Sequence, residues 1–373
     1  MACAALCNAV SESILKELER SNVQGEPGDV SSTLMTEPPS LSEAMAAVLA
    51  HRHFGVDGAA SLLPGERDEN FLIASEAGKF VLKVANPAEE LEVADLQTAA
   101  LIHLERVDPT IPVPRVLPSL QGELNATGRD DNGSARVLRL VSFLPGSMAA
   151  QVDGSTGLRA GIGLMLARLD RALAGFAHPA DVHELSWDLS QAGRLRHLLD
   201  NIDDAQTRAR AGRALDQFDA SAAPALPALR TQVIHNDFSL FNVLVDKADP
   251  GAIVGVIDFG DMIRAPLIND VAIAASYHVG GGEDPLAPLA DILGAYNTVL
   301  PLRPEETDLV CDLVATRLAQ TVLITEWRAR RYPENSAYIL KNHPAASAGL
   351  ARLADVPREK AQERLRRACG LDA

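Results

Sequence analysis

Residues 235–242 read His-Asn-Asp-Phe-Ser-Leu-Phe-Asn and run directly into the apolar triplet Val-Leu-Val. This pattern predicts a tight loop that carries Asp237, followed by a strand that begins near Asn242, five residues later. Sixteen residues beyond Asn242, Asp258 ends the apolar run 253–257 and is followed by Phe-Gly-Asp. We therefore expect two strand-flanked loops to bring oxygen-bearing side chains into one site.

These residue types suit one kind of chemistry. Phosphoryl transfer to an alcohol needs a carboxylate at the hydroxyl proton and hard oxygen ligands for a magnesium ion that bridges the phosphates. Taken singly, an aspartate before a loop is usually a turn former or a helix cap. The order and spacing of Asp237, Asn242 and Asp258 favour a phosphoryl-transfer site. We expect His235 to be buried and to hold the loop through its backbone rather than to transfer a proton.

The two motifs resemble those of the aminoglycoside phosphotransferase and choline kinase superfamily, whose members share H-x-D-x-x-x-x-N followed by I-D-x-G-D. The resemblance covers nearly everything from about residue 45 onward. It implies Asp237 as the catalytic base and Asn242 and Asp258 as magnesium ligands. It also implies a fold like that of eukaryotic protein kinases.

Within that superfamily the chain most closely resembles hydroxylysine kinase and the kinase domains fused to class III aminotransferases. Non-catalytic stretches carry this resemblance, at residues 137–146, 169–173, 178–179, 255–262 and 331–335. The sequence shows no aminotransferase portion, so we expect the kinase fold to stand alone.

Hydrophobic periodicity predicts an α+β chain of two lobes, and the resemblance implies that the two lobes form a protein-kinase-like fold. A hairpin at 70–75 and 79–84, a helix at 89–106 and a strand at 137–143 predict a small N-terminal lobe with an antiparallel sheet. The segments that follow have mostly helical spacing, which predicts a larger, mainly helical lobe after a joint near Leu144.

The expected domain boundaries follow from these patterns. Residues 1–40, which end in a stretch rich in Gly, Pro, Ser and Glu, are expected to form a disordered extension. Residues 41–144 would form the N-lobe, in which Ser40 could cap the first helix together with Glu43. Residues 145–373 would form the C-lobe with the catalytic loop and the substrate helices.

Lys83 is the predicted contact to the α and β phosphates of the nucleotide, because it ends the second hairpin strand. A surface lysine on that strand is the alternative. In kinases such a lysine is usually held by a glutamate of the next helix. The register that fits the apolar face places Gln97 there, with Asp95 and Glu92 nearby, so the partner of Lys83 stays open.

The turn at 63–70 is expected to cover the phosphates through Arg67 or Asn70, although it lacks the Gly-x-Gly-x-x-Gly pattern of protein kinases. An ordinary loop is the alternative. A Walker-type loop is absent from the sequence, since the Gly-Lys pair at 78–79 is followed by Phe in a hairpin turn.

The nucleotide base is expected at the joint between the lobes, where the backbone groups of Ser142, Phe143 and Leu144 would hydrogen-bond it. The side chains at these positions do not distinguish ATP from GTP.

Composition limits the partners. A net charge of −16 argues against a nucleic-acid partner and suits a small cationic or zwitterionic alcohol better. The four cysteines show no zinc or disulfide spacing, which indicates a reducing compartment. The first residues are unlike a signal peptide and no apolar run approaches the length of a membrane span. We therefore expect a cytoplasmic protein with no membrane partner.

The predicted activity is a magnesium-dependent transfer of the γ-phosphoryl group of ATP or GTP to the hydroxyl of an amino-alcohol or hydroxy-amino acid, with 5-hydroxylysine as the first candidate. Homoserine, choline, ethanolamine, an aminoglycoside and a non-catalytic nucleotide-binding scaffold remain alternatives. Asp261 and Asp270 could lie near the active site or act as structural caps. The helix that contains Arg317, Trp327 and Arg328 could present a cation to a substrate carboxylate, or could simply face solvent.

Overall fold

The computed structural model describes residues 36, 41–65 and 68–371, so most of the predicted extension, together with Arg67, lies outside the described residues. The chain divides into two compact units. Unit 1 contains the described residues up to Arg106, then Val113–Leu144 and His178–Ala180. Unit 2 contains Val107–Pro112, Pro145–Ala177 and the described residues from Asp181 onward.

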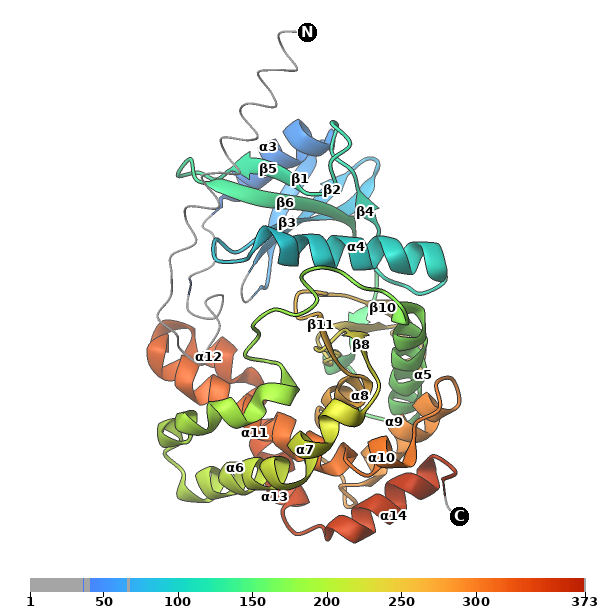
Figure 1. The fold of residues 1–373 in the computed structure, drawn as a ribbon. Coiled ribbons are helices and arrows are strands. Elements are labelled where there is room, and N and C mark those ends of the chain that lie inside the picture. The colour runs from blue at the N-terminus through green and yellow to red at the C-terminus, as the bar shows by residue number, and fades with distance from the viewer. Residues whose placement is uncertain (1–35, 37–40, 66–67, 372–373) are drawn as a thin grey trace. The chain divides into compact units, whose positions relative to one another are not determined.

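Unit 1 is built on an antiparallel sheet with the strand order β1-β2-β3-β6-β4, and β5 also pairs with β6 (Figure 1). The predicted hairpin is confirmed, and Gly78 supplies the positive φ of 136° that its turn requires. The strands are β1 Gly58–Leu63, β2 Glu69–Ser75, β3 Gly78–Val84, β4 Val116–Leu117, β5 Ala126–Arg129 and β6 Ala135–Ser142.

Two helices pack on opposite faces of this sheet, α3 Glu43–Phe54 and α4 Leu91–Val107. Alternation along β6 explains the arrangement: Leu138 and Leu140 join the core under α3, whereas Val137 packs with Leu91 and Ala94 of α4. Residues of odd number on β6, and the residues paired with them on β3, therefore face α4.

The N-cap of helix α3 lies two residues later than the sequence predicts. The cap is Ser42, whose hydroxyl accepts a hydrogen bond from the Met45 N–H at 3.2 Å. The capping role predicted for Ser40 is therefore wrong, and Ser40 itself lies outside the described residues. Glu43 accepts a hydrogen bond from the Leu62 N–H at 2.9 Å instead of closing a capping box.

Unit 2 contains two small antiparallel sheets, β10-β9-β7 and β11-β8. Their strands are β7 Ser147–Met148, β8 Thr231–Ile234, β9 Val243–Val245, β10 Ile253–Val256 and β11 Ile263–Pro266. The loop 235–242 runs from β8 to β9, and the loop 257–262 runs from β10 to β11. Since β8 pairs with β11 and β9 pairs with β10, the two motif loops cross between the sheets side by side.

The rest of unit 2 is helical, as predicted. The long helix α11 packs against α6, α8, α13 and the 3-10 segment η2 Leu189–Asn201, while α5 packs on α9 (Figure 1). The helices are α5 Thr156–Leu173, α6 Ala205–Gln217, α7 Ala223–Ala225, α8 Leu267–Ser276, α9 Ala287–Asn297, α10 Pro304–Thr307, α11 Val310–Arg331, α12 Ser336–Ile339, α13 His343–Leu353 and α14 Arg358–Ala368. Within the described ranges, no helix combines the length and the apolar character that crossing a bilayer demands.

Candidate active site

His235 joins the two motif loops of unit 2. Its side chain is fully buried, its Nδ1 accepts the Asp237 N–H at 3.3 Å, and its Nε2 donates to the Ile257 carbonyl at 3.2 Å. Burial lowers the pKa of His235, so the ring is neutral with its hydrogen on Nε2. The structural role predicted for this histidine is confirmed, because both ring nitrogens hold loop backbone.

Both motif loops contain a residue with left-handed backbone. Asn236 has φ of 63° and Asp258 has φ of 61°, and no other non-glycine residue of the described chain has a positive φ. Such conformations are costly and cluster where the chain must aim a side chain. The Asn236 N–H is held by the Asp270 carboxylate at 2.8 Å, which stabilises the turn immediately before Asp237.

Asp237 is held through both carboxylate oxygens. The Asn242 Nδ2 donates to its Oδ2 at 2.6 Å and to its carbonyl at 3.0 Å. The Tyr277 hydroxyl donates to Oδ1 at 3.2 Å, and the Arg317 Nη2 lies 3.8 Å from the same atom. With 24% of its side chain exposed, Asp237 is fixed in orientation yet still reachable by solvent.

The charges around Asp237 oppose one another. The pKa of Asp237 is raised to about 7, first by burial and then by the neighbouring carboxylates of Asp261 and Asp258, against the lowering effect of the Arg317 guanidinium. The site therefore concentrates more negative charge than a single arginine balances, which favours a bound cation.

The predicted metal ligands fit a magnesium ion. The Asn242 amide nitrogen is used by Asp237, which leaves its Oδ1 as a hard ligand, and Asp258 is exposed on its loop. Over the described ranges, no three His, Cys, Asp or Glu side chains converge as a complete metal cage. Magnesium is commonly held by one or two protein oxygens together with phosphate oxygens and water.

Asp270 and Asp261 take different positions. Asp270, fully buried at the start of α8, accepts the N–H groups of His235 at 2.9 Å and Asn236 at 2.8 Å. Asp270 therefore holds the backbone of the loop. This matches the structural role that the sequence left open as an alternative to a role in the active site. Asp261 is also buried, and its charge acts on Asp237.

Of the three predicted side chains on α11, Arg317 is the one that contacts Asp237. It is only 2% exposed, donates to the Trp187 carbonyl at 3.0 Å, and lies 4.7 Å from the centre of the Trp187 ring. Sequence reasoning missed Tyr277 and Trp187 as neighbours of the site. Tyr277 follows α8 two helical turns after Asp270, a spacing that could have indicated it.

Lys83 lies in unit 1 on β3, where its backbone pairs with Asn70 of β2 and Arg139 of β6. Paired residues share a face, so all three face α4. Gln97, the predicted partner position, accepts a hydrogen bond from Arg139 at 2.6 Å and donates to Glu89 at 2.6 Å. The buried arginine beside Lys83 was not predicted.

The other two candidate partners of Lys83 lie at exposed positions of α4. Asp95 accepts hydrogen bonds from Asn125 at 2.9 Å and from His178 at 3.1 Å. Glu92 lines a separate pocket. These contacts give Asp95 and Glu92 local roles within unit 1.

Two of the three backbone N–H groups predicted to bind the nucleotide base already make hydrogen bonds within the fold. The Ser142 N–H donates to the Arg115 carbonyl at 2.8 Å and the Phe143 N–H donates to the Lys79 carbonyl at 3.1 Å. Among the N–H groups of the three predicted residues, that of Leu144 is then the candidate for a bound base.

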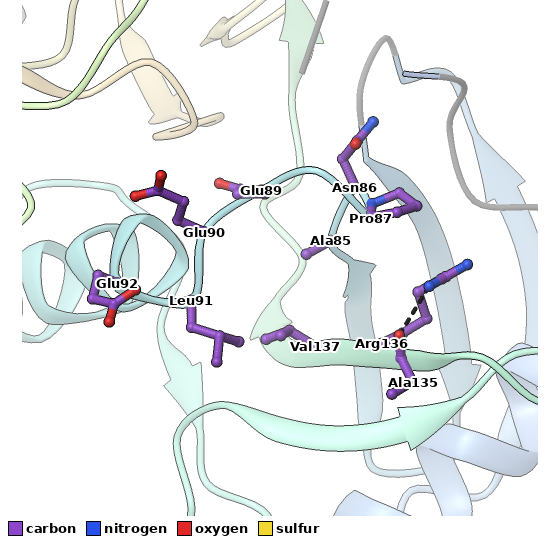
Figure 2. A pocket seen from close by; sticks show the side chains of 10 residues that line it. All are labelled: Ala85, Asn86, Pro87, Glu89, Glu90, Leu91, Glu92, Ala135, Arg136 and Val137. Carbon is purple, nitrogen blue, oxygen red and sulfur yellow. Dashed lines mark hydrogen bonds between the residues drawn. The ribbon is translucent and has the colours of Figure 1, made fainter. Parts of the chain in front are cut away.

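Unit 1 contains a pocket of about 70 Å³ whose lining includes none of the predicted nucleotide contacts (Figure 2). The pocket is lined by residues 85–87 beyond β3, residues 135–137 of β6 and the carboxylates of Glu89, Glu90 and Glu92. The concentration of acidic groups makes it unfavourable for phosphates.

Comparisons with known proteins found a matching family model, related proteins and solved structures of similar fold. The model of the phosphotransferase enzyme family matches residues 60–308. Hydroxylysine kinase of Danio rerio is 28% identical over 339 residues, which are 87% of this chain and 95% of that protein. Among solved structures, a microcompartment-associated aminopropanol kinase superposes with a TM-score of 0.67 at 19% identity, covering 83% of this chain and 96% of its own. An amicoumacin kinase superposes with a TM-score of 0.62 at 17% identity, covering 86% and 93%. The chain belongs to the phosphotransferase enzyme family.

Proposed function

We propose that this phosphotransferase is a magnesium-dependent kinase that transfers the γ-phosphoryl group of ATP or GTP to the hydroxyl of an amino-alcohol or hydroxy-amino acid, with 5-hydroxylysine as the first acceptor to test. The observation that carries the proposal is the Asp237 carboxylate, fixed by Asn242 and Tyr277 beside the charge of Asp258.

In this proposal, Asp237 orients the acceptor hydroxyl and takes its proton at Oδ1 or Oδ2 as the phosphoryl group is transferred. Asn242 and Asp258 would hold the magnesium ion. When bound, that ion would neutralise charge on the nucleotide phosphates. Lys83, with Asn70 or Arg67, would bind the phosphates, and the backbone of residues 142–144 would bind the base.

Several observations support the acceptor and donor classes. The relative named hydroxylysine kinase points to a hydroxy-amino acid, and the solved structures are described as kinases of aminopropanol and amicoumacin. The amicoumacin kinase was solved with AMP-PNP and Ca²⁺, which supports a nucleotide donor and a divalent cation. The net charge of −16 favours a cationic or zwitterionic acceptor.

The direct test is nucleotide consumption by the purified chain with magnesium, using ATP and GTP in parallel. The acceptors are 5-hydroxylysine, homoserine, choline, ethanolamine and an aminoglycoside. We expect stimulation by 5-hydroxylysine, with lysine, which lacks the hydroxyl, giving none. Stimulation by another acceptor alone would replace the substrate assignment. Nucleotide binding without stimulation by any of the five would favour an acceptor outside this panel or the non-catalytic scaffold.

The nucleotide role of Lys83 predicts a second result. Lys83→Met should weaken ATP or GTP affinity by about 10- to 100-fold, because a charge-assisted contact to phosphate is lost. Nucleotide Kd measured by calorimetry checks this. Lys247→Met, at an exposed position of unit 2, is the control and should leave Kd unchanged. Equal affinity in Lys83→Met and wild type would show that Lys83 is only a surface lysine.

A further inference from the structure

A pair of buried carboxyl groups lies beneath the predicted catalytic loop. Asp170 of α5 and Asp270 of α8 are both 0% exposed, and each carboxyl group acts on the pKa of the other. Asp270 is the residue whose two oxygens hold the N–H groups of His235 and Asn236. Asp170 has no place in the chemistry proposed above, so its burial needs a separate explanation.

The hydrogen-bond donors around the pair show which carboxyl carries a proton. The Tyr296 hydroxyl donates to the Asp170 Oδ2 at 2.7 Å, whereas no N–H or O–H group of the described chain donates to the buried Asp170 Oδ1. Both oxygens of Asp270 already accept N–H groups, which stabilise a carboxylate. Two neighbouring buried carboxylates would repel one another, whereas a carboxylic acid beside a carboxylate can donate a hydrogen bond to it. The proton therefore belongs on Asp170.

We propose that Asp170 is a neutral carboxylic acid that donates its proton to the Asp270 carboxylate, and that this bond positions the loop carrying Asp237. Asp170 acts through Asp270 and the loop backbone, so it is a positioning residue rather than a catalytic one. Its effect on turnover rests on the proposed function of Asp237, whereas its protonation does not.

The charged groups around Asp170 and Asp270 are consistent with a single negative charge shared by these two residues. Arg230, the nearby cation, is paired with Glu306 by two bonds of 2.7 and 2.6 Å. His235 is neutral because burial lowers its pKa. Burial raises the pKa of both aspartates, and the charge of Asp270 raises that of Asp170 further. The pKa of Tyr296 is also raised by burial, so its hydroxyl stays a donor. The Gln232 side chain, which donates to the Asp170 carbonyl at 2.8 Å, adds no charge.

The two aspartates should respond oppositely to replacement by asparagine. Asp170→Leu should lower kcat by on the order of 10²-fold through loop misplacement. Asp170→Asn should restore kcat to within about threefold of wild type, since its NH₂ can donate to Asp270 while its oxygen accepts from Tyr296. Asp270→Asn should lower kcat as Asp170→Leu does, because an amide nitrogen cannot accept a loop N–H. Equal loss in both asparagine variants, or a tolerated Asp270→Asn, would overturn the proposal.

Thermal unfolding of the full chain tests whether Asp170 is protonated in the folded protein, independently of any measurement of catalysis. The pKa of Asp170 is raised well above the ordinary 3.8 in the folded protein, so its contribution to stability is present at low pH and lost as pH rises through the folded value. From pH 5 to pH 10, wild type should lose Tm relative to Asp170→Asn, whose amide does not titrate. Parallel Tm profiles would show that Asp170 is not a buried acid, even if no acceptor for the enzyme were found.

Discussion

Asp237→Asn should lower kcat by on the order of 10³-fold and leave nucleotide Kd within about twofold of wild type. The asparagine cannot take the proton of the acceptor hydroxyl, and its NH₂ cannot accept the Asn242 hydrogen bond. It keeps the size of the side chain and an oxygen for the Tyr277 hydroxyl. Steady-state kinetics with the best acceptor of the panel, together with calorimetric binding of the nucleotide, measures both quantities.

A matched aspartate at the other end of β9 provides the control. Asp246 is exposed and caps only its own turn, through the Ala248 N–H at 2.7 Å. Asp246→Asn should turn over at the wild-type rate. Near wild-type kcat in Asp237→Asn would remove Asp237 from the role of base, whereas a parallel loss of kcat and nucleotide affinity would indicate damage to the fold.

Local patterns were sufficient to predict most secondary structure. The hairpin of β2 and β3 lies where alternation and a glycine turn placed it, and the buried face of α5 follows the spacing of its leucines. These signals are local because they depend on which face of one element is apolar. The α3 cap was misplaced because two serines, at positions 40 and 42, lie close enough to the helix start to compete for it.

Contacts made across long sequence distances could not be predicted in the same way. The bond from Arg139 to Gln97 spans 42 residues and depends on which face of β6 meets α4. An arginine within an apolar strand run gives no sign that it is buried and bonded to a glutamine. The sequence therefore predicted the position of Gln97 but not its partner.

In the candidate site, too, the sequence predicted the local features but not the contacts made between distant segments. Asp237 and Asn242 lie five residues apart in one loop motif, so the spacing within that motif was enough to indicate both residues. Arg317 reaches Asp237 from α11, and Asp170 lies on α5 behind Asp270. Periodicity shows only that one side of a helix is buried, not which polar group on that side points inward. Burial also argues against the predicted role of Arg317 as a cation for a substrate carboxylate. Its side chain is 2% exposed and lies against the Trp187 ring, so it is poorly placed to meet a substrate.

Asp258→Asn should lower kcat by on the order of 10²-fold at saturating nucleotide and raise the magnesium concentration for half-maximal rate, because a charged metal ligand is lost. Asparagine is the informative replacement, since it tolerates the left-handed backbone that Asp258 adopts at φ 61° and so separates ligand loss from backbone strain. Asp153→Asn, at an exposed position of the same unit, should keep the wild-type magnesium curve. If Asp258→Asn kept that curve as well, the ion would have to bind through other oxygens, and the loop's unusual conformation would need another cause.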